Sequence, residues 1–323
     1  MKKMLALLII LSMIVLAACG GEKSSTSNSG EKDAKDEITI GASLLTQSHP
    51  FQVAIKEAIE KEAGNQKVNV EVAIADQDLN RQISSIEDFI NKGVDAIIMV
   101  PVDSDGVKGA VLKAKDAGIP VVTVDISAND VEVDSHISTD NYSGGMIAAE
   151  AMAKYLEGKG EVGLTTYPEV QSVRDRIDGF KENALNHPDM KIVQELPGRT
   201  REEAKKASED MLTANPNMVG IFGFGDDMAI SADQAMTDRK VDGVVIGFDG
   251  LEEARKKVDE ENTFKAVVVQ FPDKMGQEAV KNAVKLANGE KVEKEVPITP
   301  GLYVTGKGFV DVKVENGKVI ISE

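Results

Sequence analysis

The sequence predicts an α/β fold of two doubly wound lobes, each a parallel sheet with helices on both faces. Short apolar runs alternate with helical stretches from Ile38 onward, and this alternation restarts after about residue 140. Strands that are apolar along almost their whole length are typical of a parallel sheet that is covered on both faces. Two sheets of roughly 100 residues each exceed what one core usually holds, so the pattern favours two lobes with a cleft.

In the first half of the chain, helices and strands are indicated by their different periods. Phe51, Ile55 and Ile59 recur at four-residue spacing, and isoleucines at 83, 86 and 90 form a second stripe. Such stripes are the core-facing sides of helices. The expected strands are the apolar runs at 38–45, 68–75, 95–101 and 120–125.

The second half repeats this alternation and ends differently. Strands are expected at 161–166, 191–196, 218–224, 243–248 and 264–270, and helices at 141–157, 174–186, 201–214, 227–238, 251–260 and 273–288. Near the end, apolar residues alternate with polar ones on both sides of Asn316-Gly317. An Asn-Gly pair between alternating segments predicts a β-hairpin.

The N-terminus has the pattern of an exported protein. Lys2 and Lys3 precede an apolar run from Leu5 to Leu16, followed by small residues. This is the pattern of a signal peptide, here residues 1–18. The alternative is a transmembrane anchor, but the run is shorter than the ~20 residues that a comfortable span needs.

Leu16-Ala17-Ala18-Cys19 resembles the lipobox of bacterial lipoproteins. That resemblance implies cleavage before Cys19 and acylation of its sulfur. Residues 19–37 are small or charged without an apolar period, so they are expected to form a flexible tether. Cys19 is the only cysteine in the chain, so no internal disulfide is expected.

Composition and motifs argue against several other functions. The formal net charge of −17 excludes a basic nucleic-acid footprint. The chain has no Gly-x-Ser-x-Gly, Walker or His-Glu-x-x-His motif, and its histidines at 49, 136 and 187 are scattered. We therefore expect no enzyme, no cofactor and no metal. The acidic run at 76–80 lacks the glycine that a calcium loop needs at its sixth position.

A series of motifs in order resembles the bacterial periplasmic sugar-binding proteins of the ribose-binding type. The motifs are HPF at 49–51, GVDAII at 93–98, PVDS at 101–104, AGIPVVTVD at 117–125, STDN at 138–141, RDRIDGF at 174–180, DDMA at 226–229, GFDG at 247–250 and QFPD at 270–273. Each is weak alone, but together they span nearly the whole mature chain.

This resemblance implies a type I periplasmic-binding-protein fold whose lobes are joined by a three-strand hinge and close on ligand. The first lobe would comprise 38–139 plus 271–298, and the second 140–270 plus 299–323. The protein would deliver its ligand to the permease of an ABC importer. The lipobox adds attachment to the outer face of the cell membrane, as in a Gram-positive cell, with the lipid anchor as its sole membrane contact.

The strand ends and the resemblance together indicate ligand-binding residues. Asp125 and Asp249 end strands in different lobes, although each carboxylate could instead cap the next helix. The resemblance adds Arg174 as the ligand arginine, with Arg176 expected in a structural pair. Gln270 at a crossing would contact ligand when the lobes close; the alternative is a buried amide that bonds backbone.

Four further positions enter through the resemblance. Phe51 matches a ring that stacks on sugar, or else belongs only to its helix stripe. His49 stands where ribose binders have asparagine, and Gln52 where they have a second phenylalanine. Arg199 stands where another aromatic would stack.

Departures from the ribose pattern bear on the ligand. Ile126 replaces an arginine and Gly225 replaces an asparagine. Counting Arg174 and Arg199 against Asp125 and Asp249 gives balanced charge, which favours a neutral polyhydroxylated ligand over an acidic one. The lost asparagine and aromatic rings argue against ribose and favour a larger hexose, a polyol or a differently oriented pentose. A sugar-responsive repressor would need a helix-turn-helix ahead of this fold, where this chain has the signal pattern and the acidic tether, so that function is not favoured. The alternative that stays open is a receptor for a sensor kinase or chemoreceptor.

Overall fold

The computed structural model describes residues 37–260 and 262–322. The expected signal peptide at 1–18, Cys19 and the tether up to residue 36 lie outside the described residues. Within the described ranges, no helix is both long and apolar enough to cross a membrane. The signal peptide and the lipid anchor stay predictions, because they fall on residues outside those ranges.

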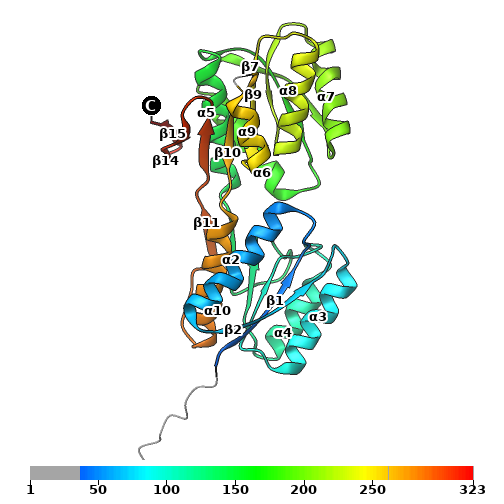
Figure 1. Cartoon of the computed structure of the whole chain (residues 1–323), viewed down its shortest axis with the longest axis vertical. Coiled ribbons are helices and arrows are strands. Elements are labelled where there is room, and N and C mark those ends of the chain that lie inside the picture. The colour runs from blue at the N-terminus through cyan, green and yellow to red at the C-terminus, as the bar shows by residue number, and fades with distance from the viewer. Residues whose placement is uncertain (1–36, 261, 323) are drawn as a thin grey trace, which may run out of the picture. The chain divides into compact units, whose positions relative to one another are not determined.

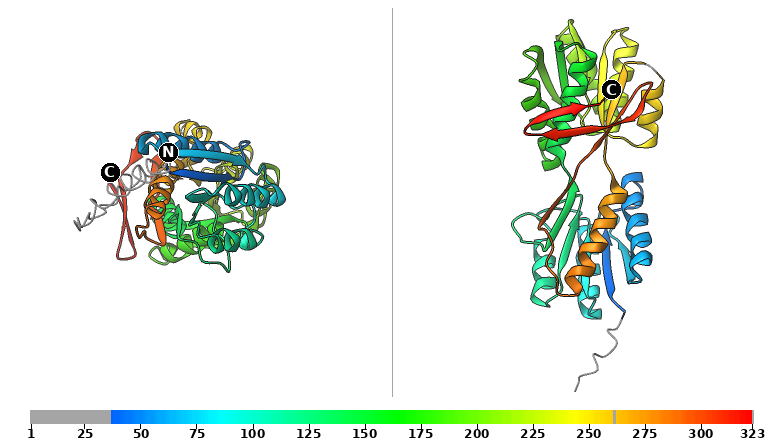
Figure 2. Two further views of the ribbon diagram at one scale, coloured as in Figure 1. Left: turned by 90° about the horizontal axis from the view of Figure 1, so that it is seen from below. Right: turned by 90° about the vertical axis from the view of Figure 1, so that its left-hand side faces the viewer.

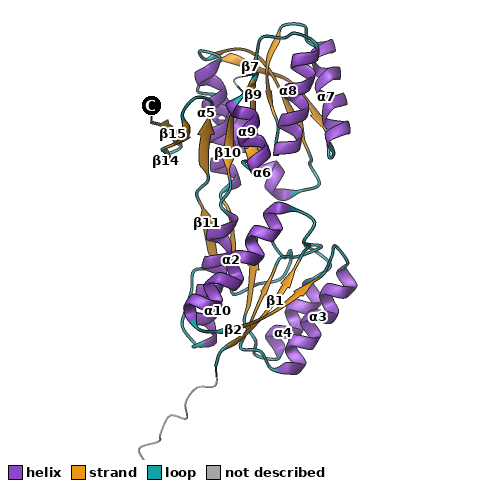
Figure 3. Ribbon diagram, viewed as in Figure 1, coloured by secondary structure: helices purple, strands orange, loops and turns teal. Residues whose placement is uncertain are grey.

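The first sheet is parallel throughout, with the strand order β11-β5-β4-β3-β1-β2 (Figures 1 and 3). Its strands are β1 (Thr39–Leu44), β2 (Asn69–Ile74), β3 (Ala96–Met99), β4 (Val121–Val124), β5 (Ser135–Thr139) and β11 (Glu295–Ile298). Its helices are α2 (Pro50–Gln66), α3 (Leu79–Lys92), α4 (Lys108–Asp116) and α10 (Pro272–Ala287). Ile98 of β3 packs in a core with α2 and α10, whereas Ile97 packs in another with α3 and α4. Because successive strand residues point to opposite faces, this sheet has helices on both.

The second sheet has the order β13-β12-β10-β9-β8-β6-β7. Its strands are β6 (Lys159–Thr166), β7 (Asp189–Pro197), β8 (Met218–Phe222), β9 (Val244–Asp249), β10 (Phe264–Val269), β12 (Gly301–Val304) and β13 (Gly308–Val310). Its helices are α5 (Asn141–Tyr155), α6 (Gln171–Ala184), α7 (Arg201–Ala214), α8 (Asp226–Asp238) and α9 (Glu252–Asp259). One core holds Ile147 and Phe180 of α5 and α6, and the other holds Met211 and Met236 of α7 and α8. The predicted doubly wound α/β class is confirmed.

The chain passes between the two sheets after β5, after β10 and after β11 (Figure 2). The sequence pattern does not predict strands at β5 and β11. Both are short, and β5 alternates buried with half-buried residues that are mostly polar, so neither has the apolar run that marks the others. These strands lie at one edge of the first sheet, where a continuous apolar run is not needed.

The predicted C-terminal hairpin is confirmed. Strands β14 (Val312–Glu315) and β15 (Lys318–Ile321) pair antiparallel, with Glu315 opposite Lys318. Between them Asn316 and Gly317 both have positive φ, 52° and 71°. This is the backbone that a two-residue type I′ turn requires.

Candidate ligand-binding site

Two aspartates stand at carboxyl ends of parallel strands, one in each sheet. Asp125 follows β4 directly, and Asp249 is the last residue of β9. Both have positive φ, 65° and 101°. A non-glycine residue in such a conformation costs on the order of 1–3 kcal/mol and is concentrated at functional sites. Neither residue caps a helix, since the N-cap of α9 is Leu251 and no helix follows Asp125 directly, so the capping alternative is wrong.

Arg176 of α6 holds Asp249 in the second lobe. Its Nη1 donates to Asp249 Oδ1 at 3.2 Å and to the Phe224 carbonyl oxygen at 2.7 Å. Its Nε donates to Asn141 Oδ1 at 2.9 Å, and its guanidinium carbon lies 3.8 Å from the centre of the Phe248 ring. Nη2 has no hydrogen-bond partner among the described residues. One edge of the guanidinium is therefore fixed, and the other can donate to a ligand.

The position of Arg176 depends on close packing of α5 against α6. A Cβ on Gly145 would lie 1.9 Å from the Arg176 carbonyl oxygen, and a Cβ on Gly179 would lie 2.0 Å from the Tyr142 carbonyl oxygen. Only glycine permits this approach of the two backbones. The two glycines thus let α6 pack close to α5, and this packing sets the position of Arg176.

Gln270 joins Asp249 to a crossing segment of the chain. Its Nε2 donates to Asp249 Oδ1 at 2.7 Å, and its Oε1 accepts from Thr139 Oγ1 at 2.6 Å. The adjoining crossing is linked by the Asp140 amide, which donates to the Ile298 carbonyl oxygen at 3.0 Å. The Gln270 amide bonds side chains at the hinge, so the alternative of an amide that bonds only backbone is wrong.

Asp125 is held from the first lobe by Gln52, whose Nε2 donates to Asp125 Oδ2 at 2.9 Å. Burial raises the pKa of Asp125 to about 6, against the opposing effects of the Gln52 hydrogen bond and the Arg176 charge; Asp249 adds a smaller upward effect. Gln52 is buried, and its Oε1 has no hydrogen-bond partner among residues 37–260 and 262–322. A buried acceptor without a partner is costly, so this atom is a natural contact for a ligand hydroxyl.

Asp226, the first residue of α8, supports Asp249 from behind. Its carboxylate accepts from the amides of Gly250 at 3.1 Å and Leu251 at 2.7 Å. Burial first, and then the charge of Asp249, raise the pKa of Asp226 well above its usual value. These bonds hold the turn in which Asp249 adopts its positive φ.

A cleft of 560 Å³ is lined by loops from both sheets. Its lining includes Asp125, Ser138, Thr139, Asn141, Tyr167 and Arg174. The volume lies within the ~300–1,000 Å³ usual for small-molecule sites. Most of these side chains are polar, as expected for a ligand that is recognised through hydrogen bonds.

Arg174 lines this cleft but does not reach the aspartates. Its guanidinium donates to Gln171 Oε1 and to the Pro168 carbonyl oxygen, within its own helix and the loop before it. Two residues on a helix differ by ~200° in direction, so Arg174 and Arg176 point to opposite sides. The structure places Arg176, not Arg174, against Asp249. The expectation that Arg176 forms a structural pair is confirmed, with Asp249 as its partner.

Arg199 lies apart from both aspartates. It forms an ion pair with Glu203, at 3.3 Å between Nε and Oε2, and its guanidinium carbon is 6.0 Å from the centre of the Tyr167 ring. Its side chain is 58% exposed and lines a neighbouring pocket with Tyr167. It therefore does not contribute to the charge balance at Asp125 and Asp249.

His49 and Phe51 open α2 in different settings. His49 is the exposed N-cap residue, without a side-chain capping bond. Phe51 is 5% exposed and packs with Ile55 and Ile59 in the first-lobe core. The structure thus places Phe51 in the core-facing stripe of its helix, which is the alternative to a ring that stacks on sugar.

Sequence reasoning missed Asn141, Asp226 and Tyr167 as members of the site, and it named Arg176 without its partner Asp249. The motifs at 138–141, 174–180 and 226–229 contain Asn141, Arg176 and Asp226. Their roles depend on which side of a helix or turn each faces. Tyr167 belongs to no motif, but it precedes Pro168 just after a predicted strand, where a cleft residue is expected. No group of acidic, histidine or cysteine residues that could hold a metal occurs in residues 37–260 and 262–322.

Known proteins are similar to this chain in sequence and in fold. Residues 40–291 match the family model described as a periplasmic binding protein domain. The ribose import binding protein of Bacillus subtilis is 33% identical over 298 residues, 92% of this chain and 97% of that protein. An ABC transporter periplasmic solute binding protein from Actinobacillus succinogenes with bound D-allose has a TM-score of 0.76 and 27% identity, covering 82% of this chain and 97% of that one. A solute binding protein from Mycobacterium smegmatis with bound glycerol has a TM-score of 0.73 and 32% identity, covering 83% and 94%.

Proposed function

This chain belongs to the periplasmic binding protein domain family as a sugar-binding protein of the ribose type, and we propose that it captures a neutral monosaccharide or polyol for an ABC importer. The observation that carries the proposal is the bonded set of Asp249, Arg176 and Gln270 beside a polar cleft. Planar groups with paired hydrogen-bonding atoms suit vicinal hydroxyls, which both donate and accept. The family consists of binding proteins rather than enzymes.

The unused hydrogen-bonding atoms support a polyhydroxylated ligand. Arg176 Nη2 is an available donor, Gln52 Oε1 an available acceptor, and the carboxylate of Asp125 accepts from hydroxyls. Similar proteins are named for ribose or have D-allose or glycerol bound. A Cβ on Gly225 would lie 3.2 Å from Asp249 Oδ2, so glycine leaves room there for a ligand larger or differently turned than ribose.

We infer that capture proceeds by hinge closure. Asp125 and Gln52 belong to the first lobe, whereas Asp249 and Arg176 belong to the second, so one ligand engages both sets only when the lobes approach. Gln270 and Thr139 bond across the crossing segments about which such a movement would turn. A ligand that binds the closed state better shifts the population toward it.

The experiment that tests the function is a thermal-shift screen over pentoses, hexoses and polyols, followed by small-angle scattering. A true ligand at 100 times its Kd should stabilise the protein by ~2.7 kcal/mol, and saturation should reduce the radius of gyration. Sugar acids and amino acids serve as control ligands. Stabilisation by these controls alone contradicts the proposed ligand class, and an unchanged radius at saturation contradicts closure.

Affinity is expected to fall as pH is lowered from 7 to 5. The pKa of Asp125 is raised to about 6, so below pH 6 the unliganded carboxyl is mostly protonated. A ligand hydroxyl that donates to the ionised form must then displace a proton, so affinity falls by up to about tenfold at pH 5. Calorimetry at both pH values measures this change. The Asp125→Asn variant should bind the ligand more weakly, and its affinity should depend less on pH. If the affinity of this variant depends on pH as before, the effect belongs to another group, such as Asp226.

We also propose that the protein acts on the outer face of the cell membrane, held by acylated Cys19. The N-terminal pattern and the family support this placement together. A lipid anchor with a flexible tether keeps a binding protein beside its permease in a cell without an outer membrane, as in Gram-positive bacteria.

A further inference from the structure

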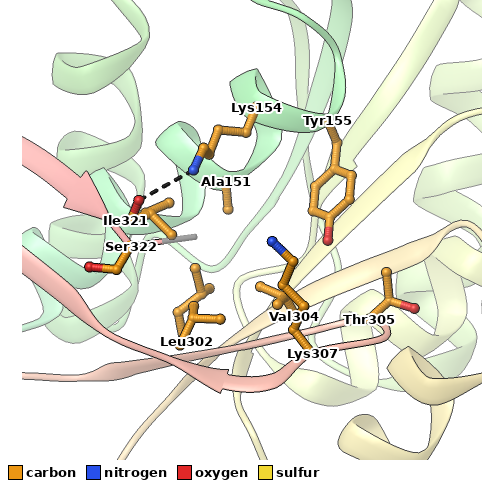
Figure 4. A pocket seen from close by; sticks show the side chains of 10 residues that line it. Ala151, Lys154, Tyr155, Leu302, Val304, Thr305, Lys307, Ile321 and Ser322 are labelled. Atoms are coloured by element: carbon orange, nitrogen blue, oxygen red, sulfur yellow. Dashed lines mark hydrogen bonds between the residues drawn. The ribbon is translucent and has the colours of Figure 1, made fainter.

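We propose that a second pocket, built by the C-terminal segment on the second lobe, binds small organic anions that have an apolar body. This C-terminal pocket is lined by Ala151, Lys154 and Tyr155 of α5, by Leu302 and Val304 of β12, and by residues of the segment 305–322 (Figure 4). It shares no lining residue with the polar cleft. The family model ends at residue 291, so the match to the family does not account for it.

The pocket exists because the chain continues beyond β12. β13 pairs antiparallel with the edge of β12, and the β14–β15 hairpin then packs its inner side, including Val314 and Ile321, against the core beneath α5. Ile321 thereby closes one side of a space of 330 Å³ over Leu302. This volume is at the lower end for small-molecule sites, so it fits a single ring or a branched chain.

The floor of the pocket is aliphatic and belongs to the core of the second lobe. Ala151 and Leu302 are buried, and Val304 is 7% exposed, so all three belong to the core of the lobe. The small side chain of Ala151 leaves space above Leu302 that a larger residue would fill. An apolar group placed there would lose contact with water, which favours its binding.

The mouth of the pocket is positively charged in a protein of formal net charge −17. In Figure 4 the ammonium groups of Lys154 and Lys307 both point toward the space over Leu302. Lys154 Nζ donates to the Ile321 carbonyl oxygen at 3.3 Å, and neither lysine forms an ion pair within the described part of the chain. The Tyr155 hydroxyl points to the same space.

The apolar floor and the cationic mouth together favour a ligand that has both an anionic group and an apolar body. An anionic group can accept from Lys154, Lys307 and Tyr155 while its apolar body covers the floor. A small carboxylic acid with an aromatic or branched apolar body has both the anionic group and the apolar surface. Because the two lysines are exposed, their pairing is screened and the affinity should be modest.

The test compares three probes on the full-length mature protein by ligand-observed NMR titration. Phenylacetate has both charge and apolar body, phenylacetamide has the body without the charge, and acetate has the charge without the body. Phenylacetate should bind at least about fivefold more tightly than either other probe. Equal binding of phenylacetate and phenylacetamide, or no binding of phenylacetate, overturns the proposal.

Variants locate the binding. Lys154→Met with Lys307→Met should weaken phenylacetate binding about fivefold. The matched control, Lys313→Met with Lys318→Met, removes two exposed lysines of the adjoining β14–β15 hairpin and should leave binding unchanged. Equal losses in both pairs would show only general charge attraction and overturn the site.

Competition with a sugar distinguishes binding in this pocket from binding in the polar cleft. A sugar that binds the polar cleft should not displace phenylacetate, so displacement would place the probe in the cleft and contradict the proposal.

Discussion

Arg176→Met is expected to weaken ligand capture by at least two orders of magnitude. The substitution removes the free Nη2 donor and the hydrogen bond to Asp249. A hydrogen bond to a charged group contributes about 1.5–3 kcal/mol, and removing one partner of a buried pair costs about 3–5 kcal/mol. Arg176 is 7% exposed, so in the variant water cannot easily replace the hydrogen bonds of its guanidinium group. Calorimetry with the ligand found in the thermal screen measures the loss.

The matched control is Arg174→Met, on the same helix two residues earlier. Because Arg174 bonds Gln171 and Pro168 rather than an aspartate, this variant should bind within a few-fold of the original protein. A larger loss for Arg174→Met than for Arg176→Met would restore the assignment made from resemblance. Asp249→Asn, which keeps Arg176 and its packing, should also lose affinity, and an intact thermal transition in each variant shows that folding is not the cause.

The sequence was sufficient for features that depend on periodicity. The stripe of Phe51, Ile55 and Ile59 faces the first-lobe core, and the Asn316-Gly317 pair forms a hairpin turn. Asp125 and Asp249 could be located because they end apolar runs, and such ends lie at one edge of a parallel sheet. These features need only local pattern and the general geometry of strands.

Which arginine bonds Asp249 could not be predicted in this way. The choice depends on where α6 begins and how α6 is turned against α5, and α6 begins at Gln171 rather than at the expected residue 174. The rotation of α6 about its axis is set by its close approach to α5 at Gly145 and Gly179. This approach is a contact between segments that are distant in sequence. Arg199 shows the same limit: its partner Glu203 is near in sequence, yet the direction of the loop away from the aspartates is a tertiary property.

Cys19→Ala is expected to remove acylation completely, which is the largest effect predicted for the whole protein. The resemblance to the lipobox implies both cleavage and acylation at Cys19, and alanine has no sulfur to acylate, so the variant should either keep residues 1–18 or be released without lipid. Each buried acyl methylene adds ~0.8 kcal/mol to membrane binding, and one chain gives only marginal attachment, so stable anchoring needs two or more chains.

Intact mass separates the two outcomes where membrane fractionation alone does not. An uncut signal peptide could itself retain the variant at the membrane through the apolar run of Leu5 to Leu16. The unaltered protein should lack residues 1–18 and carry the mass of its acyl chains, whereas Cys19→Ala should carry no acyl mass. Ser25→Ala, in the same tether, is the control and should remain acylated. An acylated, membrane-retained Cys19→Ala protein would contradict the anchor, and with it the argument that the tether keeps the binding lobes within reach of a permease.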